Sequence, residues 1–303
     1  MQGIKTAKFF ERRGRRIEEF GGLLWHGMEK RTLIALPYHL DLNLSREDAE
    51  RLLWKTTSVG LRYGSTGQAG SPGGIYTIRD KNYGLDNLSR SYCRDVKLGL
   101  KKCEVREVGA ETLLREGLQL NVDTMQRQGR WEAEYGEPKQ FERLVRAIAD
   151  SDGVFALGSF VGERLGAYAI CVREDGWLHH LHQFSLRELL KEHCNHTLCF
   201  EMVRTQMAHP EVEAFCDGFA PLVALEGLDT FKKRQGFALE ARNTVSVLHP
   251  LIDRTVASDT GRAMLERLRV KRPEDQRIGR VVSIVDAARA AKQEMRMDEV
   301  CTQ

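Results

Sequence analysis

The sequence predicts an α+β fold in which a mixed, mostly antiparallel β-sheet is flanked by helices. Between residues 103 and 248 the hydrophobic period switches repeatedly, in the order strand, two helices, three strands, helix, strand, helix, strand. The three central strands are joined by "GERL" and "EDG", connections so short that these strands must pair as an antiparallel meander. Together, the order of elements and the meander indicate one compact α+β domain.

Local patterns place each element of this domain. "CEVREV", residues 103–108, alternates as a strand does, and a second helix begins at Pro138, a favoured first helical position. The later elements are a helix over 195–208, the short buried strand "VEAFCDG", a helix over 223–235 and the strand "ARNTVSVLHP".

The segments on either side are less regular. Before residue 100 the patterns predict the strand "RTLIALPYHL", a helix capped by Ser45, a mobile Gly/Ser-rich loop over 64–74, the strand "GIYTI" and a basic helix over 90–102. Residues 251–303 are helical and charged. We therefore expect three regions, residues 1–99, 100–250 and 251–303.

Composition narrows the class of protein. The 303 residues carry 46 Lys and Arg against 43 Asp and Glu, and a net charge of only +3 does not by itself imply a nucleic-acid partner. Seven cysteines without a CxxC pair argue against a disulfide framework or a zinc ribbon, and favour a reducing compartment. No apolar run is long enough for a secretory signal or a membrane span, so we expect a cytoplasmic protein.

The order of elements, with Asp217-Gly218 after the short strand and "FKKRQGF" at 231–237, resembles the GNAT acyltransferase superfamily. More narrowly it resembles the Fem-type (FemAB-like) branch, whose members pair two such domains; residues 1–99 then look like a reduced GNAT-like copy. The resemblance implies an N-acyltransferase that moves an acyl group from acyl-CoA, such as acetyl-CoA, or from aminoacyl-tRNA to a small-molecule or peptide amine. The site would lie where the fourth and fifth strands of the domain separate, and no metal is expected.

The donor's pyrophosphate would rest on the helix that starts near "KEHCNHT", because free N–H groups and the helix dipole attract anions there. This sequence departs from the family's Q/R-x-x-G-x-G/A loop, since no glycine occurs between Gly176 and Gly218. This departure makes coenzyme A a less favoured acyl donor and aminoacyl-tRNA a more favoured one. The donor-binding candidates at the strand end and helix start are Gln183, Phe184, Ser185, Asn195, His196 and Thr197.

Three residues are candidates for proton transfer. Period-2 alternation places His180 and His182 on one face of "WLHHLHQFS", where they can supply a general base near neutral pH or bind a substrate carboxylate. Their alternative role is that of half-buried structural histidines. Asp217 can orient the incoming amine or accept its proton, or it can be a turn aspartate that bonds its own backbone.

The remaining catalytic candidate is Lys232. On a helical wheel it lies within the apolar stripe of Leu225, Leu228 and Phe231, whereas Lys233 and Arg234 point away. Its ammonium can stabilise the oxyanion of a tetrahedral intermediate or bind a donor phosphate, or its stem can snorkel to solvent. Fem-type relatives tend to have Phe-Lys here, where many GNAT acetyltransferases have a tyrosine.

Two other classes of function remain open. One is a catalytically silent GNAT-fold module that binds a ligand or a partner, which the missing glycine loop favours. The other is a nucleic-acid-binding protein, with tRNA as one partner, acting through the basic segments 5–16 and 90–102. For both segments a solvated charged face is the simpler interpretation, and the oligomeric state cannot be read from the sequence.

Overall fold

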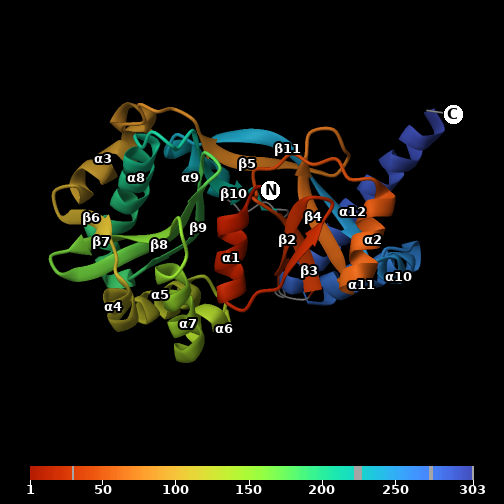
Figure 1. Ribbon diagram of the computed structural model, residues 1–303, viewed down its shortest axis with the longest axis horizontal. Helices are drawn as coiled ribbons and strands as arrows, with labels where there is room; N and C mark the ends of the chain where they lie inside the picture. The colour runs from red at the N-terminus through yellow and green to blue at the C-terminus, as the bar shows by residue number, and fades with distance from the viewer. Residues whose placement is uncertain (29–30, 222–226, 273–275, 302–303) are drawn as a thin grey trace.

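A computed structural model describes residues 1–28, 31–221, 227–272 and 276–301 (Figure 1). Over these residues eleven strands form one sheet, in the order β1-β2-β3-β4-β11-β5-β10-β9-β8-β7-β6. Two neighbouring pairs, β3 with β4 and β9 with β10, are parallel, and the other pairs are antiparallel. The predicted α+β class with a mixed, mostly antiparallel sheet is therefore confirmed.

The elements of the first half are α1 Ile4–Arg12, β1 Ile17–Phe20, β2 Leu23–Met28, β3 Thr32–Leu36, α2 Arg46–Thr56, β4 Gly60–Ser65, β5 Ser71–Ile78, the 3₁₀-helix η2 Leu85–Asn87 and α3 Arg90–Gly99. Those of the middle are β6 Cys103–Glu107, α4 Ala110–Thr112, the π-helix η3 Leu113–Gly117, α5 Leu118–Arg127, α6 Ala133–Gly136, α7 Pro138–Ala149, β7 Val154–Val161, β8 Arg164–Glu174 and β9 Trp177–Ser185. The last are the 3₁₀-helix η4 Arg187–Glu192, α8 Cys194–Met207, β10 Ala214–Phe219, α9 Leu228–Arg234, β11 Ala238–Leu248, α10 Pro250–Thr255, α11 Asp259–Lys271 and α12 Gln276–Cys301.

Strands from the two halves of the chain pair with each other in the sheet. Strand β5 belongs to the first half, yet it pairs with β10 of the second, and β11 returns to lie between β4 and β5. Although only residues 66–70 separate β4 from β5, the two strands do not pair with each other. The sheet is thus continuous, and the region boundaries at residues 99 and 250 stay predictions.

Helices cover both faces of the sheet. Figure 1 shows α3 and α8 on one side of β6–β9 and α5 and α7 on the other, while α1 stands between the two halves and contacts β2 and β8. Helices α2 and α12 pack on β11. Two clusters of buried apolar side chains result, a large one around β7–β9 and a smaller one that includes Trp25, Leu52 and Val245. None of the helices described is both long and apolar enough to cross a bilayer.

Two local predictions agree with the structure only in part. The predicted mobile loop over 64–74 is wrong at both ends, because those residues continue β4 and β5. Gly74 is required there: a Cβ would lie 2.3 Å from the carbonyl oxygen of Glu240 on β11. The helix predicted over 223–235 is described only from Leu228, and Leu225 lies outside the described residues.

The contact between α3 and α8 is close enough to test. A Cβ on Gly99 would lie 2.0 Å from Thr197 Oγ1 and 3.0 Å from the Cβ of His193. Gly99→Ala should therefore lower the free energy of unfolding by about 1–3 kcal/mol, the usual cost of overpacking. The measurement is urea denaturation.

Gly109→Ala is the matched control, because no heavy atom lies within 4 Å of its would-be Cβ. It should stay within about 0.5 kcal/mol of wild type. Equal stability of the two variants would show that α3 and α8 are not in tight contact.

Candidate functional site

Strands β9 and β10 separate in the middle of the sheet. Their parallel ladder pairs Ala214 with Trp177, Phe215 with Leu178 and Cys216 with His179, and it ends there. The next residue of each strand is His180 on β9 and Asp217 on β10. The strand separation expected from the resemblance therefore occurs at two of the candidate residues.

Asp217 lies between two other candidate residues and contacts both of them. One of its carboxylate oxygens contacts His180 Nδ1 and the other contacts Lys232 Nζ, which comes from α9. All three side chains are largely buried, with 11%, 7% and 16% of the side-chain surface exposed for His180, Asp217 and Lys232. The Lys232 ammonium also lies 5.1 Å from the ring centroid of Phe237, within cation–π range.

The orientation predicted for the cations of α9 is confirmed. Lys232 points inward to Asp217, whereas Lys233 is 68% exposed and pairs with Asp229 one turn earlier. Arg234 is also exposed. Helical periodicity thus identified the one inward-facing cation of this run.

The charges define the state of the site. Burial alone would raise the pKa of Asp217, but the Lys232 ammonium and His180 outweigh it and hold that pKa below its usual value. The carboxylate is therefore ionised at neutral pH, and His180 must donate its Nδ1 proton to it because a carboxylate only accepts. The other ring nitrogen, Nε2, is buried and has no hydrogen-bond partner among the described residues.

A β-bulge separates the two candidate histidines. On β8, Cys171 lies opposite His180 and Ile170 lies opposite His182, so Leu181 is the extra residue. Because Cys171 and Ile170 are adjacent on their strand, their partners lie on opposite faces of the sheet. The prediction that His180 and His182 share a face is therefore wrong, and regular alternation failed because of one inserted residue.

His182 lies instead against Tyr135 of α6. Burial, followed by the nearby positive charge of Arg13, lowers the pKa of His182 well below its ordinary value. The imidazole is neutral at pH 7. No contact joins it to Asp217 or Lys232 among the described residues.

The predicted donor-binding residues fall into two groups. Phe184, Ser185 and Thr197 are buried in the packing between helices and sheet. Gln183 donates to Asn195 Oδ1 at 2.6 Å and to Cys199 Sγ at 3.3 Å, and His196 packs on the ring of Tyr92. The N-cap of α8 is His193, in a left-handed conformation and without a side-chain bond, and Asn195 lies in the first turn of the helix.

The start of α8 is covered rather than open. Residues Arg187–Glu192 form η4 in place of a glycine loop, and the last turn of α3 packs on His193 and Thr197 at Gly99. Backbone close to a pyrophosphate normally needs glycine and an unobstructed helix terminus. Neither is present at this position.

Sequence reasoning missed Arg13. The segment 5–16 was expected to be a solvated basic face, yet the Arg13 side chain is only 1% exposed and pairs with Glu134. For Arg13 the expectation is wrong, because four closely spaced arginines hide which one lies on the apolar side of α1. Phe9 and Phe10, both buried beside it, were the available signal.

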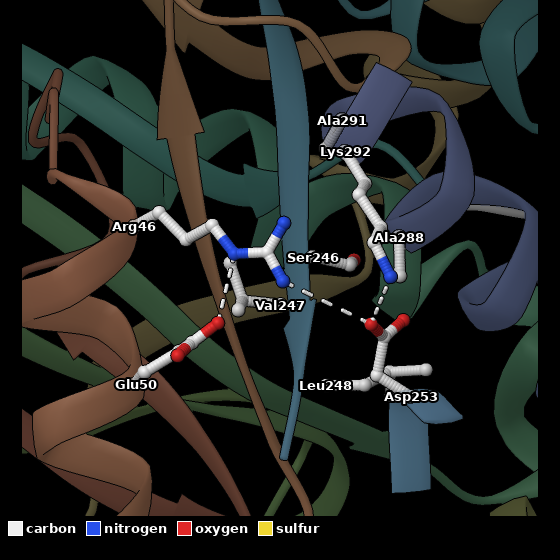
Figure 2. A pocket seen from close by; sticks show the side chains of 9 residues that line it. All are labelled: Arg46, Glu50, Ser246, Val247, Leu248, Asp253, Ala288, Ala291 and Lys292. Atoms are coloured by element: carbon white, nitrogen blue, oxygen red, sulfur yellow. Dashed lines mark hydrogen bonds and ion pairs between the residues drawn. The ribbon is translucent and has the colours of Figure 1, made fainter. Parts of the chain in front are cut away.

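A small polar hollow lies elsewhere, between α2, β11, α10 and α12 (Figure 2). Arg46 pairs there with Glu50 at 2.8 Å, and Asp253 contacts Lys292. Its volume of about 30 Å³ is far below that of a substrate-sized pocket. Within the described part of the chain, no group of three or more His, Cys, Asp or Glu side chains is placed to hold a metal ion.

Comparison with known proteins adds the fold family. No protein-family model and no curated protein matches the chain in sequence. The structure of FemX is similar at a TM-score of 0.55 and 13% identity, covering 84% of this chain and 93% of that one. The C-terminal domain of an Agrobacterium fabrum protein described as a lysylphosphatidylglycerol synthetase has a TM-score of 0.54 and 14% identity, covering 85% and 93%.

L-PGS from Bacillus licheniformis is similar at a TM-score of 0.50 and 12% identity, covering 80% of this chain and 86% of that one. At these identities the likeness concerns the fold. The chain therefore shares its fold with FemX and L-PGS, in agreement with the GNAT/Fem-like fold that its sequence predicted.

The buried charge of Asp217 has a pH signature. Because its folded-state pKa is depressed, its stabilising contribution is present above the unfolded value near 3.8 and is lost as the pH falls through the lower folded value. Asp217→Asn should lower the free energy of unfolding at pH 7 by about 3–5 kcal/mol, since it breaks a buried ion pair. The gap from wild type should narrow as the pH falls from 4 to 3.

Urea denaturation at several pH values measures this gap. Asp150→Asn, an exposed position at the end of α7, is the control and should show no such pH dependence. A gap that stays constant down to pH 3 would mean that Asp217 is not ionised in the folded protein.

Proposed function

We propose that this protein is an acyltransferase that transfers an acyl or aminoacyl group to an amine. The observation that carries the proposal is the His180–Asp217–Lys232 chain at the point where β9 and β10 separate. The GNAT/Fem-like fold supports it. So do the structural neighbours of the chain, which include FemX and a protein described as a lysylphosphatidylglycerol synthetase. Neither fold nor neighbours identify the acceptor.

The geometry suggests a division of roles. In its neutral form His180 can take the proton of the attacking amine at Nε2, which has no partner among the described residues, and Asp217 orients the imidazole and stabilises its protonated form. The amine nitrogen forms a bond to the acyl carbon, and the carbonyl oxygen becomes an oxyanion. The Lys232 ammonium has N–H groups left after pairing with Asp217 and can stabilise that oxyanion. The intermediate then expels the donor's oxygen or sulfur, which receives the proton from His180.

These roles differ from the expectation that Asp217 or His182 is the base. An ionised carboxylate that already accepts from two donors is a weak base, and His182 lies on the other face of the sheet. We therefore assign the base to His180 and give Asp217 a positioning role.

For the donor, we favour aminoacyl-tRNA over acyl-CoA. The covered start of α8 and the absent glycine loop leave a poor pyrophosphate site. On the exposed face of α3, Arg90, Lys97 and Lys101 form no ion pair with any described residue and line a shallow depression. The buried face of α3 reaches α9 through Tyr92, whose ring meets that of Phe231 next to Lys232.

The catalytically silent module remains the second candidate, because the same missing loop favours it. A module of that kind has no need for an imidazole held by a buried carboxylate. Donor binding and turnover separate the two functions.

His180→Gln should reduce the rate of acyl transfer by at least about 10²-fold, the usual contribution of general base catalysis. The measurement is release of deacylated tRNA from a mixture of aminoacyl-tRNAs in the presence of pooled amines. His209→Gln is the control, since His209 follows the far end of α8. Unchanged turnover in His180→Gln would remove this residue from the mechanism.

The donor assignment predicts a salt-dependent affinity. Aminoacyl-tRNA should raise the melting temperature of the protein, whereas acetyl-CoA and longer acyl-CoAs should not. Replacing Arg90, Lys97 and Lys101 together by Glu should weaken tRNA binding at least about ten-fold and flatten its dependence on salt. The triple change Arg267→Glu, Arg269→Glu and Lys271→Glu on α11 is the control for net charge, and stabilisation by acyl-CoA alone would reverse the assignment.

A further inference from the structure

A second polar cluster lies across β9 from His180, beside the helix α1 that stands between the two halves (Figure 1). Its side chains come from the turn after α1 and from β2, α6 and β9. We call it the arginine cluster; it consists of Arg13, Arg15, His26, Glu134, Tyr135 and His182.

Arg13 lies at the bottom of the cluster. Its Nε pairs with Glu134 Oε1 at 2.5 Å and its Nη2 donates to the Tyr135 hydroxyl at 2.7 Å. The guanidinium carbon lies 4.9 to 5.5 Å from the ring centroids of Phe9, Phe10 and Tyr135. Three aromatic rings and two hydrogen bonds thus hold this cation in one orientation.

The cluster carries an excess positive charge. Arg15 pairs with the second oxygen of Glu134 at 2.5 Å, so two guanidiniums share one carboxylate. The neighbouring Arg130 is already paired with Glu132. Burial, then Arg15 and Arg13, lowers the pKa of His26 to about 4, and burial raises the pKa of Tyr38 and of Tyr135, so these groups are neutral at pH 7.

Two buried donors or acceptors of the cluster are unused. Arg13 Nη1 and His26 Nδ1 have no hydrogen-bond partner among the described residues, although both atoms are shielded from solvent. Buried polar atoms in folded proteins are nearly always satisfied, and a buried charge is nearly always paired. A cluster that lacks one negative charge and lacks acceptor oxygens for its buried donors is typical of an anion-binding site.

The cluster is closed at Arg13 and more open at its rim. The Arg15 side chain is 25% exposed and that of Glu134 is 12% exposed, compared with 1% for Arg13. His182 on β9 is half-buried, and beyond the pair Cys216–His179 the edge of β9 is not bonded to β10. Because His182 follows His180 by two residues on β9, the arginine cluster and the point of strand separation meet on the same strand.

We propose that the arginine cluster binds a single negatively charged oxyacid group, a carboxylate or a phosphodiester, on the acceptor molecule. One negative charge balances the cluster, and its oxygens accept from Arg13 Nη1 and from the rim. The assignment to the acceptor rests on the proposed function: the acid group is held on one side of β9 while the amine meets His180 on the other side, at the point where the β9–β10 ladder ends. Acceptors that lack an acid group are then poor substrates.

Binding can be tested without turnover. The probes are sodium acetate and sodium dimethyl phosphate, each compared with sodium chloride at equal ionic strength. At least one probe should raise the melting temperature in a saturable way, and at neutral pH the ring NMR signals of His182 should shift with the same saturation. The signal of His209, outside the cluster, should not move. The two probes also separate the carboxylate from the phosphodiester.

Variants locate the binding. Arg15→Gln removes the excess charge at the rim and leaves the pair of Arg13 with Glu134 intact, so the protein should fold and bind the probe at least about ten-fold more weakly, the effect of one lost charge-assisted contact. Arg13→Gln should abolish binding wherever it folds. Arg12→Gln, an exposed neighbour on α1, is the matched control and should bind as wild type does.

The proposal is overturned if neither probe exceeds chloride, if the ring NMR signals of His182 do not respond, or if Arg15→Gln binds as tightly as Arg12→Gln. None of these results bears on the donor or on His180, whose tests are separate. Conversely, if the protein proves not to be an acyltransferase, the binding experiments with acetate and dimethyl phosphate still show whether the arginine cluster binds an anion.

Discussion

The ionised carboxylate of Asp217 is the constraint around which the second half of the molecule is arranged. A charge buried to this degree is tolerated only with close partners, and here they come from different elements, an imidazole on β9 and an ammonium on α9. The parallel ladder must end at Cys216 for His180 to turn toward Asp217, and α9 must present Lys232 rather than Lys233. Strand separation, helix orientation and charge state are therefore consequences of one interaction.

Much of this was readable from the sequence, because it is local. The order of elements, the antiparallel meander and the inward direction of Lys232 follow from periodicities of 2 and 3.6 residues. The family resemblance added the prediction that the site lies where β9 and β10 separate. What failed was non-local or depended on a single residue: the bulge at Leu181 reverses the face of His182, and nothing in the alternation of "WLHHLHQFS" signals it.

The arginine cluster illustrates a second limit. Four arginines within residues 12–16 suggest a solvated face, and the partner that buries one of them, Glu134, lies more than a hundred residues away. A pair of phenylalanines before Arg13 marks the apolar side of α1, but it does not reveal a carboxylate on α6. Burial of charge is decided by tertiary partners, which periodicity does not report.

The insertion of β11 between β4 and β5 bears on how the chain reaches this structure. Strands β4 and β5 are near neighbours in sequence, and the simplest early event would be a hairpin between them. That hairpin is absent from the final sheet, where both edges are held apart for a strand that ends at Leu248. During synthesis the first half therefore waits with one open edge on β4 and two on β5 until most of the chain has emerged. Folding is then dominated by long-range contacts, and those exposed edges are the points most open to mispairing.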